Sequence, residues 1–355
     1  MSGGAGSATS RHDWTLPGLY EVADGVFRIP LPLPNDGLRA VNVYVVVDGG
    51  QLVLVDSGWA LDAAVTELEL RLKQLGFSGE AITRVLVTHA HRDHYTLATR
   101  LRRRYGSALA LGAGERHYLR AVRDGSAQAT RAARLRAHGA TDLADRAARP
   151  APRPDLAEWA DPDDWLTAPG TVALRERELA VVATPGHTRG HVVFADHRHG
   201  LLFAGDHVLP HITPSLSVEP EPAALPLRDY LRSLRLTKTL PEMRLLPGHG
   251  PVTAGFHDRV DELLAHHDRR LRAALDVVRD RAGATTANTV ATLLPWTRHN
   301  RTFAQLDPGN RTLAVLETAV HLDVLVEDGL LTTADRLGVR YYEPAGPHRP
   351  TTGED

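Results

Sequence analysis

The sequence has no cysteine and no long apolar run. Because cysteine is absent from all 355 residues, disulfide bridges and thiolate metal ligands are excluded, and any metal ion must bind to His, Asp or Glu. No apolar run approaches the length that spans a bilayer, and the opening "MSGGAGSATS" lacks the basic start and apolar stretch of a secretory signal. These absences predict a cytoplasmic protein with no membrane partner.

A surplus of charge of one sign is also missing, since the formal net charge is only -2. A balance this close to neutral favours neither a nucleic acid nor a membrane surface as partner. The basic residues are nearly all Arg, however, and residues 100–160 hold 13 Arg against 6 Asp and Glu. With 43% hydrophobic residues, the chain has core material for one large domain and a small one.

The first two thirds of the chain predict strands and helices in a mixed order. The runs "VFRIPLPL", "VNVYVVV" and "LVLVD" are separated by turn residues and predict strands. Apolar residues at helical spacing predict a helix from Leu61 to Leu75, and "ITRVLVT" predicts a buried strand. Residues 97–160, rich in Ala, Leu and Arg, are predicted to be helical. The runs "VALRERELAVVAT" and "HVVFADHRHGLLFAGD" predict further strands, the second as a hairpin.

The last hundred residues are predicted to be mainly helical. Helices are expected at 258–281, 289–294 and 313–328, followed by a two-stranded wing in "GLLTTADRLGVRYYEP". The predicted organisation is a flexible leader at 1–14, a large domain at 15–255 with a helical insertion at 100–160, a linking helix at 256–283, a small domain at 284–345, and a flexible tail at 346–355.

The most informative stretch is "VTHAHRDHY", residues 87–95, which puts three His and one Asp into six consecutive positions. It follows a predicted strand, and strand ends are where rigid scaffolds present ligands. Four such side chains exceed what one tetrahedral zinc with an open position needs, which favours two metal ions. Three more candidates follow strand-like runs beside glycine, which permits close backbone approach: His187 in "TPGHT", Asp206 in "AGDH" and His249 in "LPGHG".

The order "HAHRDH", "GH", "GD" and "GH" resembles the metallo-β-lactamase superfamily over about residues 20–255. The resemblance implies an α/β fold, an αββα sandwich with the metal site at one edge of two sheets. It implies two divalent metal ions, Zn²⁺ first and Fe or Mn as alternatives. The implied ligands are His89, His91 and His187 for the first ion, Asp93, His94 and His249 for the second, and Asp206 between them. Asp56, which ends "LVLVD", is predicted to orient His91 or a neighbour as a hydrogen-bond acceptor.

The resemblance implies a hydrolase. Two metal ions that share a water lower its pKa to about 7, and the resulting hydroxide would attack a carbonyl carbon. Asp93 and Asp206 are the predicted catalytic carboxylates, because they could steer this oxygen and take its proton. The favoured reaction is cleavage of a thioester, ester or lactone. The alternatives are a nuclease acting on RNA or DNA, a mononuclear iron persulfide dioxygenase, and a non-enzymatic winged-helix regulator, because the family core fixes reaction type better than substrate.

The Arg-rich residues 100–160 bear on the substrate. Arginine forks bind phosphates and carboxylates, so a lid formed by this segment favours an anionic small molecule or an acyl-carrier thioester. Arg102, Arg103 and Arg120 are the predicted clamp, and an ordinary solvated helical face is the alternative. His207 and His211, which follow Asp206, are predicted to line the substrate pocket.

The C-terminal stretch "NRTLAVLETAVHLDVLVEDGLL" with the wing "GVRYYEP" resembles the winged-helix-type domain of one hydrolase branch of the superfamily. Residues 255–355 hold 12 Arg against 15 Asp and Glu, which suits a polyanion poorly. We therefore expect this domain to pack against the large domain or to form a pocket wall. A homodimer is compatible with the sequence.

Overall fold

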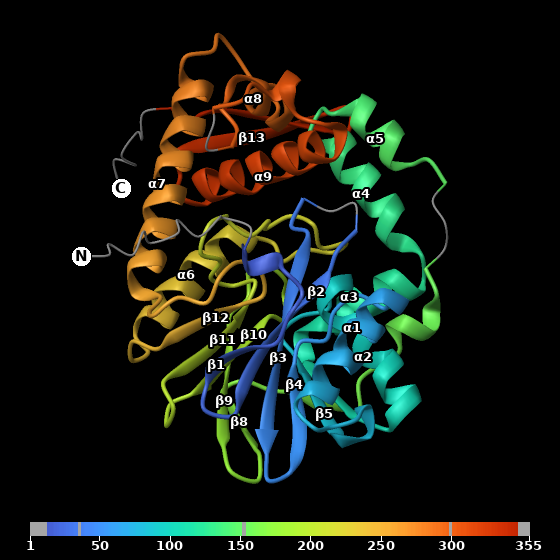
Figure 1. Ribbon diagram of the computed structural model, residues 1–355. Coiled ribbons are helices and arrows are strands. Elements are labelled where there is room, and N and C mark those ends of the chain that lie inside the picture. The colour runs from blue at the N-terminus through green and yellow to red at the C-terminus, as the bar shows by residue number, and fades with distance from the viewer. Residues whose placement is uncertain (1–12, 35–36, 151–153, 298–299, 347–355) are drawn as a thin grey trace, which may run out of the picture.

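Two β-sheets packed face to face form the centre of the computed structural model, which describes residues 13–34, 37–150, 154–297 and 300–346 (Figure 1). The first sheet contains, in spatial order, β1 (Tyr20–Ala23), β2 (Val26–Pro32), β3 (Ala40–Asp48), β4 (Gln51–Val55), β5 (Ile82–Val87), β6 (Ala108–Gly112) and β7 (Asp164–Leu166). The second contains β12 (Arg244–Pro247), β11 (Leu201–Gly205), β10 (Val192–Asp196), β9 (Glu178–Ala183) and β8 (Gly170–Ala173).

Helices cover the outer face of each sheet. The pairs β4–β5 and β5–β6 are parallel, so each needs a crossover, which α1 (Asp62–Gln74) and α2 (Arg92–Tyr105) supply. On the other side, α6 (Pro226–Lys238) is the crossover between the parallel strands β11 and β12, and α7 (His257–Arg279) follows β12. The predicted αββα order of layers is therefore confirmed.

The core between the sheets consists of side chains from both inner faces. Tyr44 of β3 and Phe203 of β11 meet edge to face, with ring centroids 5.6 Å apart. Around this pair, Val46, Val53 and Leu86 of the first sheet are buried against Val181 and Phe194 of the second. Because β3 is buried along almost its whole length, its sequence reads as a continuous apolar run rather than an alternating one.

One part of the predicted helical stretch 97–160 is a strand. The run "ALALG" forms β6 and extends the first sheet beside β5. Short apolar runs of Ala and Leu do not distinguish a buried strand from a helix by periodicity, and pairing with β5 decides the outcome. The helices of this stretch beyond α2 are α3 (Arg116–Arg123), α4 (Ser126–Ala137) and α5 (Thr141–Ala147).

The C-terminal helices pack on the insertion as well as on the sandwich. They are α8 (Ala287–Leu293) and α9 (Pro308–Glu327), followed by the hairpin of β13 (Leu331–Arg336) and β14 (Val339–Pro344). Leu135 of α4 and Ala144 of α5 share a buried cluster with Val315 and Leu316 of α9, and Figure 1 shows α4 and α5 beside α9. The winged-helix assignment itself stays a prediction.

The long helix α7 joins the sandwich to the C-terminal part. Near its start, Val260 and Leu263 belong to the core of the second sheet. Near its end, Ala274 and Val278 belong to a separate core with α8, α9 and the hairpin. Helix α7 therefore carries one apolar surface from the first core into the second.

The predicted terminal segments lie mostly outside the described residues, which omit 1–12 and 347–355. Trp14, inside the predicted leader, belongs to the short helix η1 (Asp13–Thr15), and its carbonyl accepts a hydrogen bond of 2.7 Å from Arg28. The other short 3-10 helices are η2 (Gly79–Ala81), η3 (Ala113–Glu115), η4 (Leu156–Trp159) and η5 (Phe303–Gln305). Within the described parts of the chain, the helices are too short or too polar to cross a bilayer.

Candidate metal centre

The predicted ligands all follow strands that end at the same edge of the sandwich. In the first sheet, β4 and β5 are parallel, and they lead into Asp56 and the segment 88–94. In the second sheet, β9 and β11 are both antiparallel to β10, and β12 is parallel to β11. These three strands therefore run the same way, and their ends lead to His187, Asp206 and His249.

Three imidazoles form the first ligand set: His89, His91 and His187. One ring nitrogen from each lies within 4.8 Å of the other two, and His91 Nδ1 is 3.0 Å from His187 Nε2. Two nitrogens bound to one tetrahedral zinc at about 2.0 to 2.1 Å lie about 3.3 to 3.4 Å apart, so a spacing of 3.0 Å is close to that of two ligands of one ion. His89 Nε2 is buried without a hydrogen-bond partner among the described residues.

The second ligand set consists of Asp93, His94 and His249. His94 Nε2 lies 3.3 Å from His249 Nε2. The Oδ2 atom of Asp93 is 3.3 Å from His249 Nε2 and 3.7 Å from His94 Nε2. Asp93 and His94 sit in the first turn of α2, whose preceding residue His91 belongs to the first set. The start of one helix thus contributes to both sets.

Asp206 lies between the two sets. Its Oδ1 atom is 3.5 Å from His94 Nε2 and 3.6 Å from His249 Nε2, whereas its Oδ2 atom is 3.6 Å from His187 Nε2. Oδ1 is buried and has no hydrogen-bond partner in the part of the chain that the structure describes. Buried polar atoms are rarely left without a partner, so this oxygen fits a place where a bound cation would satisfy it.

The predicted orienting role of Asp56 falls on His94 rather than His91. Its Oδ2 atom lies 2.8 Å from His94 Nδ1, while its Oδ1 accepts 2.8 Å and 3.0 Å hydrogen bonds from the backbone and hydroxyl of Thr88. Asp56 has a φ of 59°, a left-handed conformation that Asp tolerates better than most residues. Because the carboxylate accepts a hydrogen bond from His94 Nδ1, the Nε2 atom of this ring can direct its lone pair toward the centre.

Backbone carbonyls orient two other histidines in the same way. His249 Nδ1 donates to the carbonyl of Ala40 at 2.8 Å, and His187 Nδ1 donates to the carbonyl of Ser215 at 2.6 Å. In each case the Nε2 atom is left facing the centre. The elements that supply these acceptors, β3 and the loop after β11, are thereby tied to the ligands.

Glycines beside the ligands are required by close contacts. A Cβ on Gly248 would lie 2.5 Å from Asp206 Oδ1 and 2.7 Å from His94 Cε1. Gly186 has a φ of 138°, and a Cβ there would lie 2.5 Å from the backbone of Tyr230. A larger residue at either position would displace a ligand loop.

The two sets differ in electrostatics. Burial lowers the pKa of His91 and of His187 to about 3, and that of His89 well below its ordinary value. These rings are neutral at pH 7 and have lone pairs available. Metal-ligating histidines must be neutral, so the first set is ready to bind an ion.

In the second set, nearby charges outweigh burial. Burial alone would lower the pKa of His94, but the carboxylates of Asp56, Asp206 and Asp93 raise it to about 10. The pKa of His249 is raised in the same way, against burial, by Asp206 and Asp93. Burial would raise the pKa of Asp93, but the charges of His94 and His249 hold it well below its usual range. In the metal-free protein, His94 and His249 therefore hold extra protons at the place where a metal cation would bind.

Two supporting residues were missed at the sequence level. His191 is buried, its Nδ1 lies 2.8 Å from Thr184 Oγ1, and its Nε2 accepts a 3.2 Å hydrogen bond from the backbone N–H of Asp206. Asn42 donates to the carbonyls of Pro247 and Gly250, on either side of His249, at 2.9 and 2.8 Å. The available signals were the second "GH" in "PGHTRGH" and a polar Asn inside an apolar strand.

The structure does not bring the predicted pocket histidines to the centre. His207 is fully buried, and its Nε2 lies 2.8 Å from Thr237 Oγ1 on α6, on the outer side of the second sheet. His211 lies on the surface of the loop that follows β11. Adjacency to Asp206 in sequence was the only reason to expect them in the pocket, and the turn after β11 directs His207 elsewhere.

The predicted arginine clamp is also dispersed. Arg102 and Arg103 lie in the last turn of α2, about 14 Å along the helix axis from Asp93 in its first turn. They donate to the carbonyls of Asp161 and Ala157 at 2.8 and 2.6 Å and so hold the chain that returns to β7. Arg120 forms an exposed ion pair of 3.2 Å with the carboxylate of Glu221. Carboxylates outside the insertion thus neutralise part of its positive charge.

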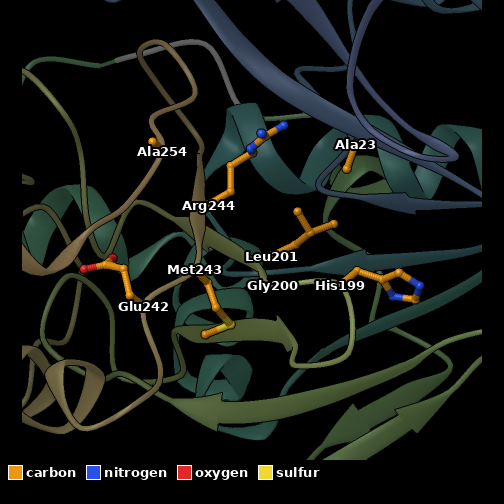
Figure 2. Close-up of a pocket in the computed structure, with 8 residues that line it drawn as sticks. All are labelled: Ala23, His199, Gly200, Leu201, Glu242, Met243, Arg244 and Ala254. Atoms are coloured by element: carbon orange, nitrogen blue, oxygen red, sulfur yellow. The ribbon is translucent and has the colours of Figure 1, made fainter.

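A cavity of about 450 Å³ lies at the other end of the second sheet (Figure 2). Leu201 and Arg244, which line it, begin β11 and β12, whereas Asp206 and His249 follow the opposite ends of these strands. Four residues of strand span about 13 Å. A molecule bound in this cavity would therefore not reach the ligand sets.

Comparison with known proteins agrees with this arrangement. The beta-lactamase-like protein 2 homolog of Caenorhabditis elegans is 26% identical over 317 residues, 88% of each chain. The atrochrysone carboxyl ACP thioesterase of Aspergillus fumigatus is 24% identical over 265 residues, which cover 72% of this chain and 66% of that protein.

A beta-lactamase domain protein from Burkholderia ambifaria has a similar solved structure, with a TM-score of 0.76 and 30% identity over 93% of this chain and 95% of that one. The family model described as metallo-beta-lactamase superfamily matches residues 36–249, more than half of the chain. All the predicted ligands lie within this matched segment. Together with the sandwich and the convergent ligands at its edge, the match shows that the chain belongs to the metallo-beta-lactamase superfamily.

Proposed function

We propose that this hydrolase cleaves the acyl bond of an anionic thioester, with esters and lactones as related substrates. The observation that carries the proposal is the position of Asp206, whose two oxygens face two different ligand sets at 3.5 to 3.6 Å. A related protein of 24% identity is named as an acyl carrier protein thioesterase. This name supports a thioester as the first substrate class to test.

In this proposal, two divalent ions occupy the ligand sets. His89, His91 and His187 would hold one ion, Asp93, His94 and His249 the other, and Asp206 would contact both. When bound, such ions would lower the pKa of a water molecule and polarise a carbonyl oxygen. The His and Asp donors suit zinc, and they also suit iron or manganese.

The carboxylates differ in their access to substrate. The side chain of Asp93 is 22% exposed, compared with 9% for Asp206, so Asp93 lies on the open side of the centre. Its lowered pKa keeps it ionised at neutral pH, and it can accept a hydrogen bond from the attacking water and orient it. Attack forms a C–O bond to the acyl carbon, the C–S bond breaks, and the proton lost by water ends on the departing thiol.

In this proposal, the residues of the insertion that approach the open side of the centre are Tyr118 and Arg131, in place of Arg102, Arg103 and Arg120. The ring of Tyr118, on α3, lies edge-on to the ring of His91 with centroids 5.6 Å apart. Arg131, on α4, is exposed and forms no ion pair with the other described residues. Its charge is close enough to Tyr118 to lower the pKa of that phenol against the larger effect of burial. We therefore propose Arg131 as a contact for the anionic part of the substrate.

The test measures turnover of acyl-coenzyme A and acyl-phosphopantetheine thioesters by the zinc-loaded protein. The released thiol is detected with a colorimetric reagent. Because the chain has no cysteine, it adds no thiol background. We expect turnover that a chelator abolishes and added zinc restores. Absence of thiol release across the panel, with lactone or ester hydrolysis present, would contradict the thioester assignment.

A further inference from the structure

One peptide group connects the first ligand set to the C-terminal helix α9. The carbonyl oxygen of Ser215 accepts the hydrogen bond from His187 Nδ1 at 2.6 Å. The N–H of Leu216 donates to Glu317 Oε2 at 3.3 Å. The carbonyl of residue 215 and the N–H of residue 216 belong to the same planar peptide unit. A chain of two hydrogen bonds therefore runs from the imidazole through this peptide to the carboxylate.

We propose that Glu317 is a positioning residue that acts on His187 through the Ser215–Leu216 peptide group. The inference rests on the proposed function, because it takes His187 as a metal ligand. A carboxylate that accepts a hydrogen bond from a peptide N–H polarises that peptide and strengthens the bond to its carbonyl oxygen. The stronger acceptor holds the proton on Nδ1 of His187, fixes the ring and makes Nε2 a better donor to metal.

Among the described residues, the Leu216 N–H is the group that hydrogen-bonds to the Glu317 carboxylate, while His321 Nδ1 lies 3.9 Å from Glu317 Oε1. The side chain is 20% exposed, and partial burial raises its pKa to about 7, against the opposing effects of the Leu216 N–H and the Arg270 charge. The guanidinium of Arg270 donates instead to the carbonyl of Pro295 at 2.8 Å. Nδ1 of the nearby His321 donates at 2.8 Å to the backbone carbonyl of Glu317, not to its carboxylate.

A second interpretation of the same cluster is a further metal site. One atom each from His267, Glu317 and His321 lie within 4.8 Å of one another, and His267 Nδ1 is 3.2 Å from His321 Nε2. The two rings, however, form a consistent donor-to-acceptor series that ends on a backbone carbonyl. The positive charge of Arg270, which affects all three groups, opposes a dication. The cluster therefore serves to fix Glu317 at the junction of α7 and α9.

The loop that carries this peptide group is also held from the insertion. Arg134 of α4 donates to the carbonyls of Ser217 and Glu219 at 3.1 and 3.0 Å. Burial lowers the pKa of Arg134 to about 10, so it stays charged at neutral pH. Since α4 also packs on α9, the loop cannot shift without disturbing both helices. This rigidity lets a carboxylate in the C-terminal part influence a ligand in the sandwich.

The first experiment compares zinc affinity of Glu317→Gln and Glu327→Gln by competition with a chromophoric chelator. At pH 8, above the Glu317 pKa of about 7, glutamine keeps an oxygen that can accept from Leu216 but removes the charge. Glu327 is on the same helix, is exposed, and pairs with the partly buried Arg228 at 2.7 Å, so its substitution is a matched control. We expect Glu317→Gln to weaken one zinc-binding event by about tenfold, the lower end for residues that support a ligand, and Glu327→Gln to change neither event.

The second experiment places Glu317→Gln in a His187→Ala background. If Glu317 acts through His187, its substitution has no further effect on zinc affinity there. Equal weakening in both backgrounds would show a purely structural role and overturn the proposal. Loss of a third equivalent of zinc from Glu317→Gln would overturn it too, because Glu317 would then be a ligand itself.

The same variants separate this inference from the function on which it rests. If His187→Ala keeps the zinc affinity of the unmodified chain, the assignment of His187 as a ligand fails. If His187→Ala loses zinc but Glu317→Gln keeps full affinity, only the connection through the peptide fails. Urea unfolding of each metal-free variant checks that the fold survives, so that a change in zinc affinity is not a consequence of unfolding.

Discussion

The two ligand sets lie side by side at one edge of the sandwich, yet their charges differ. The first set consists of three imidazoles that burial keeps neutral, with pKa values of about 3 for His91 and His187. The second combines Asp93 with two imidazoles whose pKa values are raised by carboxylates, that of His94 to about 10. The neutral set can accept a cation directly, whereas the charged set must exchange protons for one.

The largest effect should come from the residue that the two sets share. Asp206→Asn removes the negative charge that faces both sets, and we expect it to lower turnover by more than about 100-fold, since even residues that only support ligands cost about 10- to 100-fold. Metal analysis should show fewer than two ions per chain. The matched control is Asp196→Asn, which breaks a buried ion pair with Arg177 at the β10–β11 hairpin.

That control should lower stability and leave the metal content unchanged. If Asp206→Asn retains two tightly bound ions and full turnover, the shared position of Asp206 between the sets has no functional role. If both variants lose metal equally, the loss follows from general destabilisation.

The second prediction separates the sets through Asp56. Asp56→Asn removes the carboxylate nearest to His94 Nδ1, and we expect about 10- to 100-fold weaker binding of the ion in the second set. Binding to the first set should be unchanged, because none of its three imidazoles bonds to Asp56. Chelator competition that resolves the two events is the measurement. Equal weakening of both events would mean that Asp56 acts through Thr88 and the β5 loop instead.

The third prediction is the pH dependence of metal binding. In the metal-free protein, both ring nitrogens of His94 are protonated at any pH below about 10. The second ion must therefore displace one of these protons. Each displaced proton makes affinity fall about tenfold per pH unit as the pH decreases, and lowering the pH from 8 to 6 should weaken this event about 100-fold. The first event should stay nearly constant over this range, because His91 and His187 titrate near 3.

Calorimetry in buffers with different ionisation enthalpies checks this difference by counting the protons released in each binding event. Release of similar numbers of protons in both events would contradict the contrast between the sets. The direction of the His94 pKa shift also affects the stability of the metal-free protein. His94 has a raised pKa and stabilises the fold fully below its unfolded pKa near 6.5, and this contribution is lost as the pH rises through about 10.

The candidate ligands could be picked out from the sequence because each follows a strand: four are clustered in "HAHRDH", and His187, Asp206 and His249 lie beside glycine. The local hydrophobic pattern predicts each strand, and the end of the strand determines where the candidate ligand after it lies. The αββα layers followed from the resemblance, and strand alternation agreed with them. The strand β6 was not predicted, because "ALALG" has a composition suited to helices and only its pairing with β5 makes it a strand.

Contacts between distant segments explain what the sequence could not provide. Arg102 and Arg103 looked like a clamp until the chain at 157–161 returned to accept their hydrogen bonds. Glu317 reaches the loop beside His187 from 101 residues away. No periodicity or motif in the sequence predicts such a long-range contact, since it depends on how α9 packs against the sandwich. Local patterns were therefore enough to propose the ligands, whereas the residues that support them became visible only in the structure.

The last and smallest predicted effect compares two arginines of the Arg-rich segment. Arg131→Gln removes an exposed charge near Tyr118 and the open side of the centre, and we expect KM for an anionic thioester to rise about tenfold, the effect of losing roughly 1.4 kcal/mol of binding. Arg103→Gln removes a donor to the carbonyl of Ala157 and should leave KM unchanged. Steady-state kinetics with a charged and an uncharged acyl thioester distinguish the two. A rise in KM for both thioesters alike would mean that Arg131 shapes the pocket and does not recognise charge.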